Sequence, residues 1–230
     1  MLLSNTAAGQ TPGTAVTIAN SDDFAESAFQ LVATNGSGAA LTYSNEQARV
    51  GGIAFKVTPV ASNSCYVQYG GSTGNLASDD TAIDAWFYRT ANPTAEHTII
   101  AATETGGVRR VNINLDTAGK VKVRDEGTTY LWTSTASIPL NAWFRVRCFS
   151  RNQGAGTSQL KVEVTNAAGT VLDSYSTTTA TRTTPIAGVA FGKTGTDASA
   201  AAFWLSEPKV ETVATNYIGT NVPPVATIGA

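Results

Sequence analysis

Thr81-Ala-Ile-Asp-Ala-Trp-Phe-Tyr-Arg89 is the stretch of sequence that decides the fold. Its apolar and polar side chains alternate with a period near two, as they do in a strand that buries one face. Two further tryptophan-bearing stretches, residues 138–148 and 202–210, alternate in the same way. Short alternating runs lie between them, bounded by Gly, Asn, Asp, Ser or Thr. The pattern predicts an all-β, antiparallel two-sheet sandwich with no helix of useful length.

The composition suits one large β-domain. The chain has 230 residues, of which 42% are hydrophobic and only 14% are charged. A surface with few charges and many hydroxyl and amide groups is typical of extracellular or virion β-proteins. Fifteen basic residues against seventeen acidic ones give a net charge of −2, with no basic stripe. Nucleic acid is therefore excluded as a main partner.

The two ends of the chain differ from its centre. Residues 1–12 and 213–230 have no strong periodicity, so we expect an N-terminal arm, a jelly-roll domain over 13–212 and a C-terminal arm. The first residues contain no basic region and no long apolar run, which predicts neither a secretory signal nor membrane insertion. Cys65 and Cys148 are too few for a disulfide scaffold and are expected to be buried thiols, with their pairing left open.

Four pieces of sequence carry a resemblance to the concanavalin A-like lectin/glucanase superfamily in its laminin G-like form. They are residues 84–88, 110–121, 140–146 and 203–210. Residues 13–20 and 41–51 are similar to domains of minor tail or virion proteins from phages that infect actinobacteria. The resemblance covers about residues 13–212. It implies a jelly roll with irregular arms, used in most members for glycan binding or adhesion and in some as an enzyme.

Catalytic motifs are scarce. A glycosidase needs two carboxyl groups that flank one bond, and no strand carries such an alternating acidic array; Asp79-Asp80 and Asp125-Glu126 are predicted to be solvated turn pairs. His97 is the only histidine and is predicted to be a surface or capping residue. We therefore expect broad sheet faces instead of a catalytic cleft, and no enzyme. A polysaccharide lyase remains an alternative if Tyr88, His97, Arg110 and Arg147 share a face.

A metal is a second alternative. The resemblance implies that one calcium ion can bind to loop carboxylates, for which Asp22, Asp23 and Glu207 are the candidates, followed by Asp79 and Asp80. Glu207 stands in the closing strand where members of the family often have Asp. We therefore expect no cofactor, with Ca²⁺ as the alternative.

A glycan site requires aromatic rings beside amides and cations, because sugar C–H faces pack on rings and hydroxyls need directional partners. Alternation along the predicted strands places one such set on the outward faces. We predict that a single sheet presents Trp86, Tyr88, Asn112, Asn114, Trp132, Arg145 and Arg147. The alternative is that these tryptophans pack structurally and that the arginines pair with nearby carboxylates.

These observations lead to one main functional hypothesis. We expect a non-enzymatic phage virion protein, a minor tail or capsid decoration component, which is made in the host cytoplasm. Its arms are suited to pairing with neighbouring subunits, so self-association and other virion proteins are the expected partners, together with a host-surface glycan. The alternatives are a free carbohydrate-binding module or lectin, and a polysaccharide lyase or hydrolase.

Overall fold

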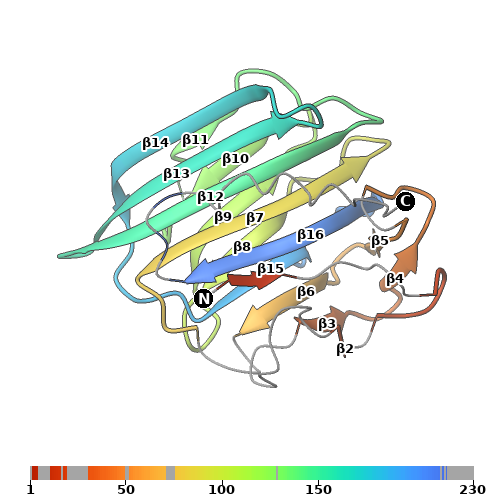
Figure 1. The fold of residues 1–230 in the computed structure, drawn as a ribbon, viewed down its shortest axis with the longest axis horizontal. Coiled ribbons are helices and arrows are strands. Elements are labelled where there is room, and N and C mark those ends of the chain that lie inside the picture. Colours follow the sequence, from red (N-terminus) through yellow and green to blue (C-terminus); the bar gives the residue numbers. More distant parts are fainter. Residues whose placement is uncertain are drawn as a thin grey trace, which may run out of the picture.

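A computed structural model shows the fold of the chain. It describes residues 2–4, 11–16, 18–19, 31–49, 52–70, 76–127, 129–212, 214 and 216. These residues form strands and connections, with no helix among them, and the strands make two antiparallel sheets that pack as a sandwich (Figure 1). The predicted all-β jelly-roll sandwich is therefore confirmed. Within the same residues, no helix has the length and apolar character needed to cross a membrane.

The front layer in Figure 1 is sheet A. β1 (Leu2–Ser4) pairs with one of its central strands, β16. From one edge to the other, its remaining strands are β14 (Val171–Thr181), β13 (Thr157–Asn166), β12 (Trp143–Gly154), β7 (Asp80–Arg89), β16 (Phe203–Thr212), β5 (Ala54–Thr58) and β4 (Ala40–Ser44).

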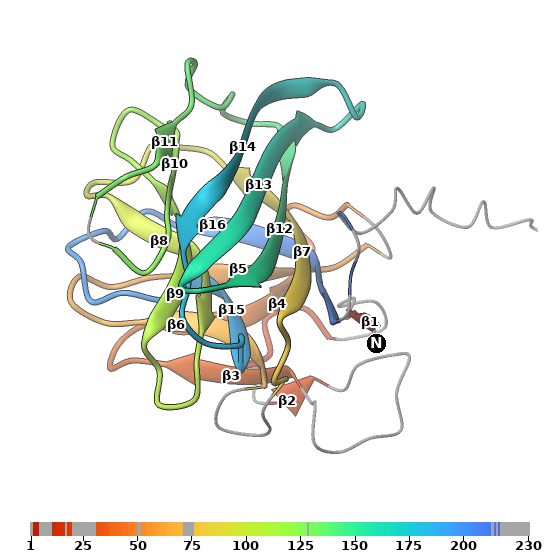
Figure 2. The same cartoon turned by 90° about the vertical axis from the view of Figure 1, so that its left-hand side faces the viewer.

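Sheet B forms the layer behind it, and the two layers are seen from the side in Figure 2. In order across the sheet, its strands are β11 (Trp132–Thr133), β10 (Val121–Arg124), β9 (Arg109–Leu115), β8 (His97–Thr103), β15 (Gly188–Lys193), β6 (Cys65–Gly70), β3 (Leu31–Asn35) and β2 (Ile18–Ala19).

The three tryptophan-bearing stretches become neighbouring strands at the centre of sheet A, in the order β12, β7 and β16. The period of two places alternate side chains between the sheets, where Phe87 of β7 stacks on Phe144 of β12 with ring centroids 5.7 Å apart. On the facing layer, β9 turns Val111, Ile113 and Leu115 into the same core. Cys65 and Cys148 are both buried thiols, as predicted.

Two hairpin turns connect neighbouring strands, and both use the same chemistry. Between β9 and β10, the Asp116 carboxylate accepts hydrogen bonds from the backbone N–H groups of Ala118 and Lys120, at 2.9 and 2.8 Å. Between β13 and β14, the side chain of Asn166 accepts two bonds in the same positions. Each turn ends at a glycine with positive φ, +77° at Gly119 and +85° at Gly169, a conformation that residues with a Cβ rarely adopt.

β16 contains a bulge at the Glu207-Pro208 dipeptide. Its pairing with β7 shifts register between Ser206 and Lys209, and Glu207 has a φ of +51°. The carboxylate of Glu207 lies in ion pairs with Arg49 and with Lys209, whose Nζ is 3.4 Å away. The residue that resemblance suggested as a calcium ligand is therefore held by two cations at a bend in the strand.

Candidate functional site

The structure divides the predicted glycan residues between the two sheets. Trp86 and Tyr88 on β7 lie on the outer face of sheet A, next to Arg145 and Arg147 on β12. Asn112 and Asn114 belong to β9 of sheet B. Trp132 of β11 stacks on Tyr175 of sheet A at 6.0 Å. The prediction that one sheet face presents all seven is therefore wrong, because alternation along a strand does not reveal which sheet the strand joins.

On sheet A, the predicted residues are engaged within the protein. The Trp86 side chain is only 6% exposed, and the Arg49 guanidinium lies 3.6 Å from its ring centroid. Arg145 forms a bidentate ion pair with the buried Asp84 carboxylate. Arg147 pairs in turn with Glu163 on β13. Tyr88 is partly open, as Arg147 is, and lies between Trp143 and Trp204 with ring centroids 5.5 and 5.8 Å away.

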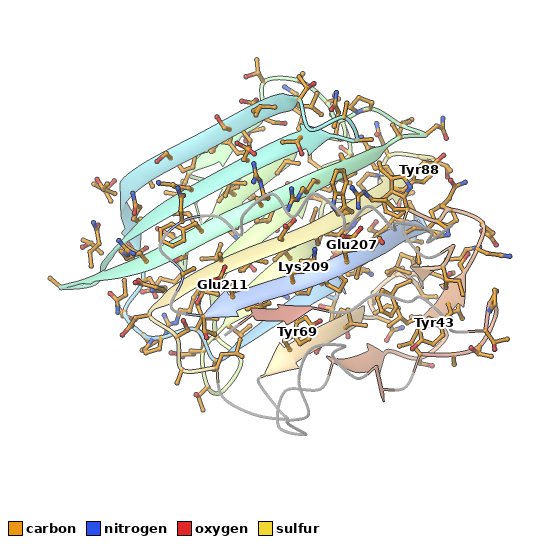
Figure 3. All side chains as sticks on the ribbon, viewed as in Figure 1. Tyr43, Tyr69, Tyr88, Glu207, Lys209 and Glu211 are labelled. Carbon is orange, nitrogen blue, oxygen red and sulfur yellow. The ribbon has the colours of Figure 1, made fainter. Side chains whose placement is uncertain are left out.

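Part of the C-terminal segment also covers this face. Ala214 packs with Ala82 and Phe149 in a small buried apolar cluster, and its N–H donates to the carbonyl of Asp80 at 3.3 Å. The outer face of sheet A is thus covered at one end and lined by ion pairs elsewhere. Figure 3 shows Glu207, Lys209 and Glu211 in a row along β16. The alternative that these side chains have structural roles fits this arrangement.

A pocket of about 300 Å³ opens on the outer side of sheet B. We call it the sheet B pocket. Strands β8, β9 and β10 supply its floor, and the loop that follows β15 supplies one wall. Its lining residues are Glu96, His97, Thr98, Arg109, Asn114, Arg124, Tyr130, Gly195, Thr196 and Asp197.

Two arginines give the sheet B pocket its charge. Arg109 donates to the carbonyl of Thr194 at 3.0 Å, and neither it nor Arg124 forms an ion pair with a carboxylate within the part of the chain that the structure describes. Burial lowers the pKa of Arg109, and the neighbouring Arg124 lowers it further, while Asp197 raises it. Arg110, one residue along β9, is by contrast neutralised by Glu104 and Glu126. The pocket also contains the carboxylates of Glu96 and Asp197, but each of these has a lysine partner, so the two arginines are the groups left to bind an anionic ligand.

A tyrosine hydroxyl lies beside these cations. The side-chain amide of Asn114 donates to the hydroxyl oxygen of Tyr130 at 2.8 Å and to Glu96 Oε1 at 2.8 Å. Lys122 Nζ and Arg124 Cζ lie 4.9 and 5.7 Å from the centroid of the Tyr130 ring. The Tyr130 ring thus lies close to two cations, and its hydroxyl oxygen accepts a hydrogen bond from an amide.

Several polar atoms of the pocket have no partner in the described part of the structure. They are the amide oxygen of Asn114, Nε of Arg124 and both ring nitrogens of His97, which are buried without a hydrogen bond. Because both amide hydrogens of Asn114 are directed to Tyr130 and Glu96, its oxygen remains as an acceptor. Buried polar groups without partners are rare in proteins, and in a pocket they indicate where a ligand would bind.

His97 is not the surface or capping residue that the sequence suggested. It begins β8, is 3% exposed, and stacks on Phe203 with ring centroids 5.6 Å apart. Burial lowers its pKa to about 4, so the imidazole is neutral at pH 7. The lyase set considered above does not assemble either, because Tyr88 and Arg147 lie on sheet A whereas His97 and Arg110 lie on sheet B.

Sequence reasoning named Asn114 but missed the cations around it. The signal was available, since continuing the alternation of β9 through the turn at residues 116–119 pairs Lys122 with Asn114 and Arg124 with Asn112 on one face. Asp197 had no such signal, because it lies in an irregular loop. The roles of the seven predicted glycan residues remain predictions.

The calcium candidates divide into two groups. Asp22 and Asp23 lie outside the described residues. Over the described ranges, no group of three or more His, Cys, Asp or Glu side chains is placed to hold a metal ion. The Asp79 carboxylate accepts a hydrogen bond from the side-chain amide of Asn152 at 3.0 Å. The Asp80 carboxylate forms an ion pair with Arg151, whose Nε lies 3.2 Å away.

The chain resembles solved structures but not sequence families. No protein-family profile and no curated protein matches the sequence. A glucuronan lyase from Trichoderma reesei aligns with a TM-score of 0.58 and 12% identity over 88% of this chain and 96% of its own. An alginate lyase from Aplysia kurodai aligns at 0.54 and 9%, over 75% and 87%. A protein of unknown function from Shewanella oneidensis aligns at 0.59 and 16%, over 95% and 90%.

These similarities show the fold, a jelly-roll sandwich consistent with the concanavalin A-like architecture predicted from the sequence. The sequence-based prediction that the chain is not an enzyme is wrong. It assumed that such sheet faces offer no catalytic cleft, yet two lyases have this fold and a polar pocket opens on sheet B. Nothing in the comparisons indicates a phage.

Proposed function

We propose that the protein binds an acidic polysaccharide in the sheet B pocket and cleaves it by β-elimination. The observation that carries this proposal is the pair Arg109 and Arg124, which lack carboxylate partners among the described residues and lie in one pocket with the Tyr130 hydroxyl. A carboxylate of a uronate residue matches the planar, charged donors of an arginine. The unpartnered oxygen of Asn114 is suited to a sugar hydroxyl.

The reaction follows from the groups in the pocket. Tyr130, as the phenolate, takes the proton from C5 of a uronate; the electron pair forms the C4–C5 double bond, and the C4–O bond breaks. The departing oxygen takes the proton back from the Tyr130 phenol. The arginines neutralise the carboxylate, so that the negative charge which develops next to C5 is stabilised. His97 also lines the pocket, but burial lowers its pKa to about 4 and makes it a weak base, so the proton transfer is assigned to Tyr130.

The comparisons support this class of function without specifying the substrate. Two of the structurally similar proteins are lyases, one of alginate and one of glucuronan. The virion role, the self-association and the synthesis in a host cytoplasm, all predicted from the sequence, remain predictions.

The test is an assay for the double bond that elimination creates. Glucuronan and alginate are each incubated with the protein, and the ultraviolet absorbance of the unsaturated product is followed. We expect Tyr130→Phe to lower kcat by at least ~100-fold, the range typical of a lost general base, and to leave binding nearly unchanged. Tyr175→Phe, which removes a hydroxyl from the aromatic pair with Trp132, is the matched control.

The outcomes separate the two parts of the proposal. Binding without any unsaturated product would reject elimination and leave a carbohydrate-binding module. Equal activity of wild type and Tyr130→Phe would reject Tyr130 as the base. No binding of either polymer would reject the sheet B pocket as a site for these glycans.

A further inference from the structure

One wall of the sheet B pocket is the loop that follows β15, and a buried lysine holds this loop in place by hydrogen bonds. Lys193, the last residue of β15, is 0% exposed. Its ammonium donates to the carbonyls of Val60 and Asp197, each at 2.8 Å. The N–H of Ser62 also donates to the Asp197 carbonyl at 2.9 Å. The backbone at Asp197 is thus fixed by two donors from outside the loop.

The Asp197 carboxylate is fixed as well. Its Oδ1 accepts from the N–H of Ser199 at 2.9 Å and lies 3.6 Å from Lys193 Nζ. Its Oδ2 and Nη2 of Arg109 lie 2.9 and 3.6 Å from one point, the place where a Cβ on Gly195 would stand. This proximity explains why Asp197 raises the pKa of Arg109 against the effects of burial and Arg124.

The charge around the two arginines of the pocket therefore differs. Near Arg109 a fixed carboxylate offsets the positive charge, whereas Arg124 has no carboxylate partner among the described residues. A ligand with one carboxylate gains most by placing it at Arg124. What it then presents to Asp197 must be neutral, and sugar hydroxyls fit because they can donate to a carboxylate.

We propose that Asp197 is a specificity-determining residue that makes the sheet B pocket select uronate glycans with a free hydroxyl at the Arg109 end over those with a sulfate ester there. A sulfate ester stays negatively charged at any physiological pH, so at the Arg109 end it would lie beside the Asp197 carboxylate and be repelled. A hydroxyl at the same position would donate to that carboxylate. The inference rests on the proposed function, because it assumes that an acidic glycan occupies this pocket.

The experiment compares one glycan in two forms, a glucuronan oligosaccharide before and after chemical sulfation. Affinities for both are measured by calorimetry with wild type and Asp197→Asn. We expect the variant to bind the sulfated form at least ~10-fold more tightly than wild type does, because one like-charge contact is removed, and to change little toward the unsulfated form. Glu211→Gln, which removes one negative charge from sheet A, is the control and should leave both affinities unchanged.

Inorganic sulfate serves as a second probe, because it reports on the charge of the pocket without the rest of the glycan. Asp197→Asn should bind it more tightly than wild type does. Asp197→Ser, which also lacks the charge, should behave as Asp197→Asn does. It replaces Asp197→Asn in the measurement if that variant folds poorly. Equal preference for the two glycan forms in wild type and variants would overturn the selectivity. If wild type binds no glycan but the variants gain sulfate binding, the proposed function and the glycan selectivity both fail, and only the repulsion of anions by the Asp197 carboxylate is supported.

Discussion

His97 makes the stability of the protein depend on pH. Burial lowers its pKa from 6.5 to about 4, so below pH 6.5 the unfolded chain takes up a proton that the folded protein does not. The stability is therefore complete above pH 6.5 and falls as the pH drops toward 4, by about 3 kcal/mol in total. Burial is the largest cause of this shift and the charge of Lys193 adds to it, whereas Asp197 and Glu96 act in the opposite direction.

Replacing this histidine tests the assignment. His97→Phe retains a flat ring to stack on Phe203 and removes two nitrogens that have no partner in the described structure. We expect urea unfolding at pH 7 to show equal or higher stability than wild type. Between pH 6.5 and 4, the variant should lose less stability than wild type by about 3 kcal/mol. The same pH dependence in both proteins would show that other groups cause it.

Lys193 connects β15 to the loop that forms the pocket wall, so its loss should affect that loop first. Lys193→Met keeps the length of the side chain but leaves the Val60 carbonyl without its donor. We expect a loss of about 2–3 kcal/mol in unfolding free energy, the range of a hydrogen bond from a charged group. Hydrogen exchange of residues 194–199 should rise more than exchange in β7 or β12.

The control for this change is Lys209→Met on sheet A, where the ammonium pairs with Glu207. It should leave the exchange of residues 194–199 as in wild type. If Lys193→Met accelerates exchange evenly over the whole chain, the lysine stabilises the sandwich as a whole and does not hold the loop in particular.

The strands themselves were largely predictable from sequence, and their arrangement was not. The period of two along β7 indicates one buried face, which Ile83, Ala85 and Phe87 occupy, and Asp116 and Asn166 are residue types that favour turns. Alternation describes only the two sides of one strand, so β7 and β9 look alike although they belong to different sheets. Sheet membership depends on pairing between distant segments, for which a single sequence carries little local signal.

The burial of outward residues was hidden for the same reason. Trp86 points away from the core and was therefore predicted to be accessible. Its ring is nevertheless covered by Arg49, a residue that follows β4 and is 37 positions away in the sequence. The sheet A face became a structural surface through such contacts, and the open polar site lies on the opposite sheet.

The protein as a whole is negatively charged although two arginines line its pocket, and this contrast leads to the last prediction. The chain has a net charge of −2, so long-range attraction should not bring an acidic glycan to it. Binding must depend on the short-range field of Arg109 and Arg124, which salt weakens where the pocket is open to solvent. Affinity for an acidic oligosaccharide should therefore fall several-fold between about 50 and about 500 mM NaCl.

Two variants connect this salt effect to one face of the molecule. Arg124→Ala in the sheet B pocket should lower the affinity and reduce its salt dependence. Trp143→Ala, on the outer face of sheet A beside Tyr88, should change neither. If binding instead proved insensitive to salt and was lost in Trp143→Ala, sugar rings would be stacking on the aromatic residues of sheet A, because contact between apolar faces is not screened by ions. The site would then belong to the sheet that the ion pairs of Arg145 and Arg147 led us to regard as structural.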